Sequence, residues 1–157
     1  MDDELTKSFI ATYYRLIYRD ISLISQLYDP QAEIIRIIKS QKIKLRYNEN
    51  VIPFDVKNTI VKINDFNNVA ISEKNLISVM GCLNINGVHQ NFLQHFILKQ
   101  NDNEKYLIIS DTFIDFEPPK IDLVCASTTA QAVDKVKRTV VREAPSTKRT
   151  TVDEFDP

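Results

Sequence analysis

The sequence is poor in the residues that mark several common kinds of site. Its 157 residues include two glycines, Gly81 and Gly87, and this scarcity excludes the loops with two or three glycines that cradle phosphates in nucleotide-binding proteins. The two cysteines, Cys82 and Cys125, provide neither a disulfide framework nor the spacing of metal ligands. We therefore expect no metal site and no cofactor.

Long apolar runs and an excess of one charge are also absent. No apolar run approaches the roughly 18 residues of a membrane-spanning helix, and no signal-peptide pattern precedes the first amphipathic segment. The chain has 20 basic and 21 acidic residues, a formal net charge of -1, so its overall charge gives no reason to expect nucleic-acid binding. We expect a soluble intracellular protein without membrane insertion.

Composition divides the chain into two parts. Residues 1–117 contain the periodic apolar segments, whereas residues 118–157 mix Pro, Ser, Thr and Ala with seven lysines and arginines. We expect one folded domain over 1–117 and a flexible, locally basic tail over 118–157. A basic stretch of this kind is typical of RNA binding or nuclear localisation, but the acidic residues around it favour a solvated tail.

The N-terminal third predicts two helices and a strand. Apolar residues at three- and four-residue spacing predict an amphipathic helix over residues 3–19. Asp20 or Ser22 can cap a second, short helix, which Asp29-Pro30 ends, because proline disfavours helical geometry in the residue before it. The β-branched run 33–38 then favours a strand.

The remainder of the domain predicts an antiparallel meander, which together with the preceding helices indicates an α+β fold. Residues 39–55 have no clear pattern beyond a loop at 47–50. Asn86-Gly87 is the strongest hairpin signal in the chain. The predicted strands are 58–66, 76–84, 88–99 and 105–116, with turns at Asn67-Asn68, Asn86-Gly87 and 101–104, and Pro118-Pro119 stops the last strand.

Both faces of the strand at 88–99 are partly apolar. One face carries Val88, Phe92, Phe96 and Leu98, while the other carries Leu93, His95 and Ile97. The helices can cover one face, so the other needs a second cover. A homodimer partner is the economical candidate, and an internal ligand cavity is the alternative.

Five short motifs, in this order, resemble the nuclear transport factor 2-like family over about residues 5–117. They are F-I-A-T-Y-Y at 9–14 followed by Leu27-Tyr28, I-P-F at 52–54 followed by T-I-V at 59–61, V-M-G at 79–81, F-L-Q-H-F-I-L at 92–98 and S-D-T-F at 110–113. The resemblance implies a cone-shaped domain in which a curved antiparallel sheet packs on N-terminal helices and dimerises through its open face.

The resemblance also implies that the domain binds proteins. Members of the family carry Ran, bind FxFG repeats of nucleoporins, form the small subunit of an mRNA-export receptor, or capture FGDF-like peptides in stress-granule proteins. We expect a non-enzymatic homodimeric adaptor of nucleocytoplasmic transport or ribonucleoprotein assembly. Its expected location is the cytoplasm and the nucleus, including the nuclear envelope and pore.

The residues separate these branches of the family. Ran carriers have acidic residues in the hairpin after V-x-G and on the first strand, where they can pair with basic groups of Ran. This chain has Asn84 to Val88 at the hairpin and Arg36, Ile37 and Ile38 on the strand. Both acidic features are missing, which argues against Ran binding. The run Val79 to Leu83 is most similar to the stress-granule branch.

In that branch the resemblance implies a groove for phenylalanine-containing peptides. The matching positions are Leu5, Phe9, Leu27 and Phe113. A shallow apolar groove can take aromatic anchors, which dominate the energetics of small interfaces. The alternative is that these residues belong to apolar stripes facing the core.

No constellation of residues indicates catalysis. His89 and His95 lie six residues apart on one predicted strand, and nothing near them in sequence completes a metal site. Asp111 on the last strand is interpreted as a satisfied buried carboxylate rather than a general base. Enzymes that share the cone fold place a carboxylate or an Asp-His pair in the cavity. We expect no catalytic residues; a small-molecule-binding or catalytic cone and a heterodimeric export subunit remain the alternatives.

Overall fold

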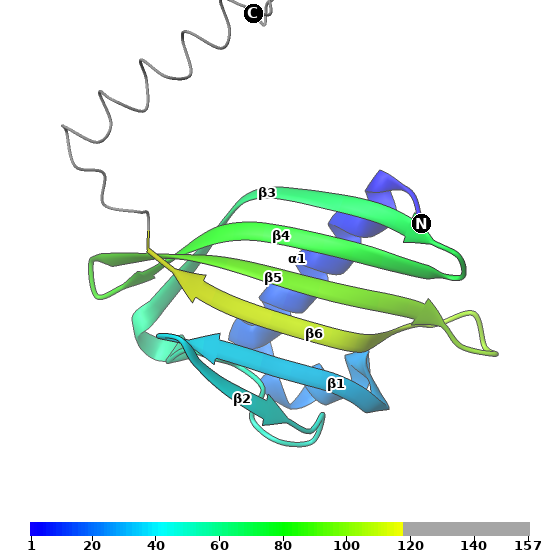
Figure 1. Cartoon of the computed structure of the whole chain (residues 1–157), viewed down its shortest axis with the longest axis horizontal. Helices are drawn as coiled ribbons and strands as arrows, with labels where there is room; N and C mark the ends of the chain where they lie inside the picture. Colours follow the sequence, from blue (N-terminus) through cyan, green and yellow to red (C-terminus); the bar gives the residue numbers. More distant parts are fainter. Residues whose placement is uncertain (118–157) are drawn as a thin grey trace, which may run out of the picture. The chain divides into compact units, whose positions relative to one another are not determined.

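The computed structural model describes residues 1–117, so the predicted tail at 118–157 lies outside the described residues. In this part of the chain, helices lie on one side of a six-stranded sheet with the strand order β2-β1-β6-β5-β4-β3 (Figure 1). The elements are α1 (Asp3–Arg19), η1 (Ile21–Leu27), β1 (Tyr28–Ile38), β2 (Gln41–Leu45), η2 (Val56–Asn58), β3 (Thr59–Ile71), β4 (Lys74–Ile85), β5 (Val88–Gln100) and β6 (Tyr106–Phe116).

Helix α1 confirms the predicted amphipathic helix, including both of its ends. The Asp2 side chain accepts a hydrogen bond from the backbone N–H of Leu5 (2.8 Å) and so caps the first turn. The helix buries Ile10, Tyr13 and Ile17 against the sheet. The second predicted helix is present as the 3₁₀ helix η1, and Tyr28, the residue after it, already begins β1.

Two of the three predicted turns are confirmed. Asn86 and Gly87 both have positive φ (52° and 84°), the geometry that a two-residue hairpin of this kind needs. The turn predicted at Asn67-Asn68 is wrong, because β3 continues through these residues, which pair with Ser78 and Ile77 of β4. The chain reverses instead at Ser72, which takes a positive φ of 57°.

The sheet is mixed rather than wholly antiparallel. Strand β1 pairs in parallel with β6, whereas every other neighbouring pair is antiparallel. β1 also starts earlier than predicted and accommodates Pro30 at an irregularity between Tyr28 and Glu33. The short strand β2 was not predicted. Its sequence, Q-K-I-K-L, is short, and four of its residues are exposed while the fifth is half-buried, so it has no buried face that would give a clear pattern. The α+β cone with helices on one face is otherwise as expected.

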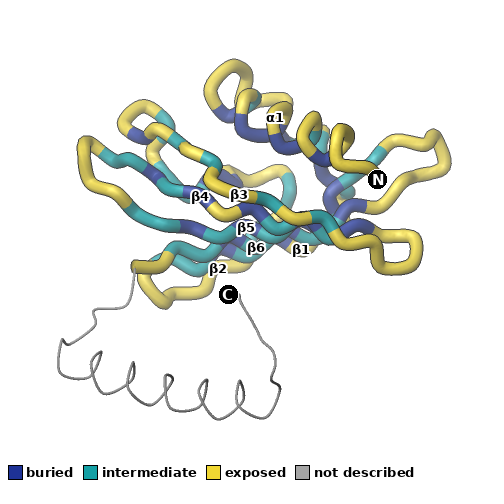
Figure 2. The backbone as a smooth tube through the Cα atoms, turned by 90° about the horizontal axis from the view of Figure 1, so that it is seen from above, coloured by how far each residue is buried: buried dark blue, intermediate teal, exposed yellow. Residues whose placement is uncertain are grey.

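The core lies between α1 and the sheet face that it covers (Figure 2). On β5 this face carries Phe92, Phe96 and Leu98, none of which is exposed. Val88, predicted to share this face, is exposed at the hairpin. The Phe92 ring stacks on that of Phe113, with centroids 5.0 Å apart and planes within 16° of parallel.

Gly81 on β4 lies directly opposite Phe92 on β5. A Cβ atom at this position would be 2.5 Å from the Phe92 ring and 2.6 Å from the backbone carbonyl oxygen of Lys62. We expect Gly81→Ala to lower the free energy of unfolding by about 3 kcal/mol, the upper end of the cost of overpacking, because a backbone atom cannot rotate away. Urea denaturation followed by circular dichroism measures this change.

Gly87→Asn is the matched control, since no heavy atom lies within 4 Å of a Cβ added there. Asparagine tolerates positive φ, so this variant should cost less than about 1 kcal/mol. Equal stability of the two variants would show that the sheet admits a methyl group at position 81.

Candidate functional site

The interior of the domain holds an ion pair between two neighbouring strands. Arg36 of β1 and Asp111 of β6 point into the covered side of the sheet, where their side chains are 2% and 0% exposed. The guanidinium donates Nη1–H to Oδ1 and Nη2–H to Oδ2, both at 2.9 Å. This bidentate geometry is the strongest form of the arginine–carboxylate interaction.

Tyr28 of β1 and groups from three other parts of the fold complete the hydrogen bonding around this pair. Gln94 on β5 donates to Asp111 Oδ1 (2.8 Å), and the Tyr28 hydroxyl donates to Oδ2. Arg36 Nε donates to the carbonyl oxygen of Val51 in the loop before η2 (2.8 Å). From α1, the Tyr14 hydroxyl donates to Gln94 Oε1 (2.6 Å). Polar groups in the interior stabilise a fold only when they are satisfied in this way.

The charges of the network are fixed by its surroundings. Burial opposes the charge on Arg36, but the adjacent Asp111 carboxylate outweighs this effect and raises the pKa of Arg36. Burial, reinforced by the negative charge of Asp111, also raises the pKa of Tyr13 and of Tyr28, which share a hydrogen bond between their hydroxyls (3.0 Å). Both carboxylate oxygens of Asp111 accept hydrogen bonds from the charged guanidinium of Arg36. This confirms Asp111 as a satisfied buried carboxylate.

Arg36 was not predicted to be part of this network. Its sequence signal is an arginine two residues after Ile34, on the same strand face by the period of two. That pattern indicates a charged side chain on the buried face of the strand. Its partner, Asp111, is 75 residues away in the sequence, so the local pattern could not identify it.

The four residues predicted to bind peptides lie on the covered side of the sheet, at different depths. Leu5 is 49% exposed, and Leu27 is half-buried. Phe9 is half-buried and packs its edge against Phe96 (5.1 Å between centroids). Phe113 is 1% exposed. A peptide can therefore reach Leu5 and Phe9 directly, whereas Phe113 supports the core under Phe92. The peptide-binding role of these residues stays a prediction.

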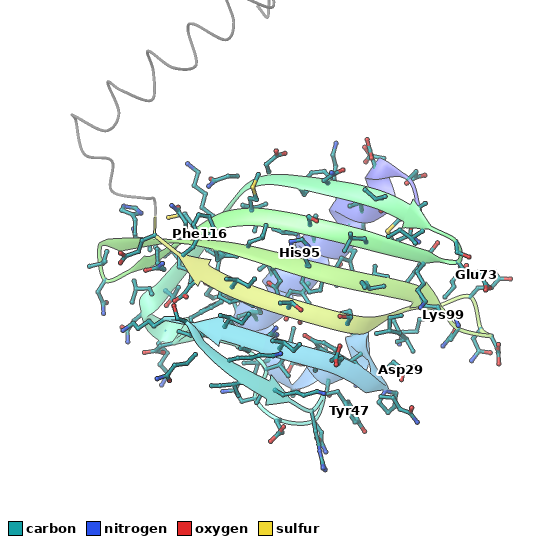
Figure 3. The ribbon with its side chains drawn as sticks, in the orientation of Figure 1. Asp29, Tyr47, Glu73, His95, Lys99 and Phe116 are labelled. Carbon is teal, nitrogen blue, oxygen red and sulfur yellow. The ribbon has the colours of Figure 1, made fainter. Side chains whose placement is uncertain are left out.

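Within residues 1–117, no helix covers the other face of the sheet, which has an apolar centre. On β5, Leu93 lies opposite Met80 of β4 and Ile114 of β6. Ile97 lies opposite Leu76 of β4 in the same way. We call this surface the open sheet face; it is the face turned toward the viewer in Figure 3. It matches the prediction that strand 88–99 is apolar on both faces.

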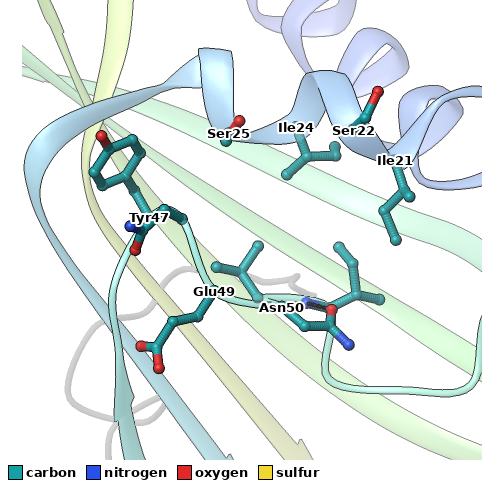
Figure 4. A pocket seen from close by; sticks show the side chains of 10 residues that line it. Ile21, Ser22, Ile24, Ser25, Tyr47, Glu49 and Asn50 are labelled. Carbon is teal, nitrogen blue, oxygen red and sulfur yellow. Dashed lines mark hydrogen bonds between the residues drawn. The ribbon is translucent and has the colours of Figure 1, made fainter.

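A cavity of about 450 Å³ lies between η1 and the loop at 47–52 (Figure 4). Its apolar lining includes Ile21, Ile24 and Val51. The one charged side chain among its lining residues, Glu49, accepts a hydrogen bond from the backbone N–H of Arg46 (2.6 Å). Neither Arg36 nor Asp111 lines this cavity.

The two histidines lie far apart on the open sheet face. His89 lies at the hairpin end of β5, where its Nδ1 is 3.5 Å from Cys82 Sγ, and His95 lies near the middle of the strand. Within residues 1–117, no group of three potential metal ligands comes together.

In the same part of the chain, no helix is long and apolar enough to cross a membrane.

The fold and its sequence identify the family of the chain. The family model described as the nuclear transport factor 2 (NTF2) domain matches residues 5–114. The chain therefore belongs to this family. A comparison with curated proteins finds no match.

Solved structures show the same fold. Nuclear transport factor 2 from Cryptosporidium parvum has a TM-score of 0.59 and 20% identity, covering 73% of this chain and 94% of its own. A chain of the complex of the yeast deubiquitinase Ubp3 with its cofactor Bre5 also has a TM-score of 0.59 and 20% identity, covering 75% and 99%. A ketosteroid isomerase-like protein from Shewanella frigidimarina has a TM-score of 0.58 at 5% identity, covering 71% and 95%. The fold thus serves transport factors and isomerase-like proteins alike.

Removing one partner of the interior ion pair should destabilise the domain strongly. We expect Arg36→Met or Asp111→Leu alone to lower the free energy of unfolding by about 3–5 kcal/mol, because each leaves a buried charge without its counter-ion. The double variant should lose less than either single one, since both charges are then gone. A double-mutant cycle by urea denaturation measures the coupling; additive losses would contradict it.

Proposed function

We propose that this chain is a non-enzymatic adaptor that pairs with a second copy through the open sheet face and binds phenylalanine-containing peptides beside α1. The apolar centre of the open sheet face is the observation that carries this proposal. An apolar sheet face without a helix or second sheet over it is a typical protein-binding surface. The pathway that we propose is nucleocytoplasmic transport or ribonucleoprotein assembly, in the nucleus and the cytoplasm.

The interior ion pair supports a binding role over a catalytic one. A general base of a cone-shaped enzyme must reach the substrate with a carboxylate that can accept a proton. Asp111 has no exposed surface, and its two oxygens accept hydrogen bonds from Arg36, Gln94 and Tyr28. A catalytic cone, the alternative function, would therefore need another acid or base.

Charges at the margin of the open sheet face favour a second candidate, pairing with a different chain. Three lysines lie on this margin: Lys74 lies directly opposite Lys99, and Lys62 lies opposite Cys82. Two identical margins of lysines repel each other, whereas a partner with an acidic margin would attract them. The second candidate function is therefore a subunit that pairs with a different chain, such as the small subunit of an mRNA-export receptor.

The oligomeric state in solution tests the pairing. We expect light scattering after size-exclusion chromatography to give twice the chain mass of 18.2 kDa for the wild type. Leu93→Glu places a charge at the centre of the open sheet face and should give the monomer mass. Ile43→Glu on β2 is the control, because Ile43 is 51% exposed and lies opposite Arg36, on the other side of the sheet. A wild-type monomer would argue for the heterodimer.

Peptide titrations test the second half of the proposal. We expect fluorescence anisotropy with labelled FxFG and FGDF peptides to show binding that Leu5→Ala and Phe9→Ala each weaken about tenfold, as for an anchor worth more than 1 kcal/mol. Ile43→Ala is the matched control, because Ile43 and Leu5 are 51% and 49% exposed. Circular dichroism should confirm that Phe9→Ala still folds. Unchanged binding by both folded variants would exclude this site.

A further inference from the structure

One ionisable side chain lies in the middle of the open sheet face. His95 is half-buried on β5, between Leu93 and Ile97 on the same strand face. Figure 3 shows it near the centre of the sheet, whereas Lys99 and Phe116 mark opposite ends. The apolar centre through which we propose that two copies pair therefore contains a side chain, His95, that can become charged.

Among the described residues, 1–117, no neighbour of His95 can neutralise a positive charge. The residues directly opposite it are Ser78 of β4 and Thr112 of β6. The nearest acidic residues on this face belong to β3 and β1, the strands beyond β4 and β6. Neither of them is in line with His95 across the sheet. Asp65 of β3 pairs with Met80, and Glu33 of β1 pairs with Ser110.

The remaining charged groups nearby are already engaged or face elsewhere. Glu33 forms an ion pair with Lys44 (3.4 Å). Asp111, the acidic residue next to Thr112 on β6, faces the covered side and pairs with Arg36. Lys74 and Cys82 are the other titratable groups on β4, each four residues from Ser78, and neither supplies a counter-ion next to the imidazole.

We propose that His95 makes the pairing of two open sheet faces depend on pH, so that the dimer forms with neutral imidazoles and separates when they gain a proton. This inference rests on the homodimer proposed above. Pairing removes water from the centre of both faces, and a charge that loses its water without gaining a partner opposes association.

Symmetry makes the effect stronger. In a two-fold dimer the same patch comes from both copies, so the partner surface brings a second His95 and the same uncharged neighbours. The paired state therefore binds protons more weakly than the free chains, and linkage shifts the equilibrium toward monomers as pH falls. The relevant range is pH 8 to 5, in which histidine ordinarily changes its charge and free carboxylates do not.

Sedimentation equilibrium at pH 7.5 and pH 5.5 tests this inference on the full chain. We expect the dimer dissociation constant of the wild type to rise on the order of ten- to a hundredfold at the lower pH, as two coupled protonations allow. His95→Gln and His95→Leu should each remain dimeric with the same constant at both pH values. His89→Gln should behave like the wild type; His89 and His95 are the two histidines of the chain.

Each other outcome contradicts a defined part of the argument. A wild-type dimer with equal dissociation constants at both pH values would overturn the role of His95, and so would a His89→Gln variant that loses the pH dependence. A wild type that is monomeric at both pH values would instead overturn the homodimer on which the inference rests.

Discussion

The ion pair of Arg36 and Asp111 is the interaction on which the rest of the domain depends. Through it, β1 is joined to β6, and the groups that complete its hydrogen bonds come from α1, β5 and the loop before η2. A buried pair of this kind adds little net stability compared with an apolar replacement. Its effect is on the interior of the domain, where Arg36 binds both oxygens of the buried Asp111 carboxylate.

Local signals in the sequence predicted the elements that depend on local physics. Asp2 and the apolar spacing after it define α1, and Asn86-Gly87 defines a hairpin, because caps and tight turns are decided within a few residues. Asn67-Asn68 has the composition of a turn but lies within β3, since pairing with β4 along its whole length overrides this local preference. The parallel pairing of β1 with β6 joins distant residues, and no short-range pattern encodes it.

For the candidate surfaces, alternation along β5 predicted both faces of the sheet, because successive side chains of a strand point to opposite sides. The depth of each aromatic side chain was not predictable in the same way. Phe9 and Phe113 both match the family motifs, but one lies at the edge of the core and the other inside it. Exposure depends on which side chains from other elements cover a position, and the interior partner of Arg36 is likewise set by the tertiary fold.

The pairing of β1 with β6 has a consequence for how the chain can fold while it is being synthesised. β1 leaves the ribosome early, but the strand beside it at the centre of the sheet, β6, is synthesised last of the six. Until β6 appears, β1 has only the short β2 as a neighbour, and Arg36 has no counter-ion. A nascent chain that ends before Asp111 therefore cannot complete its interior. The sheet can therefore be completed only in a late step, after β6 has been synthesised. Contacts between residues far apart in the sequence form more slowly than local contacts, so this topology slows folding.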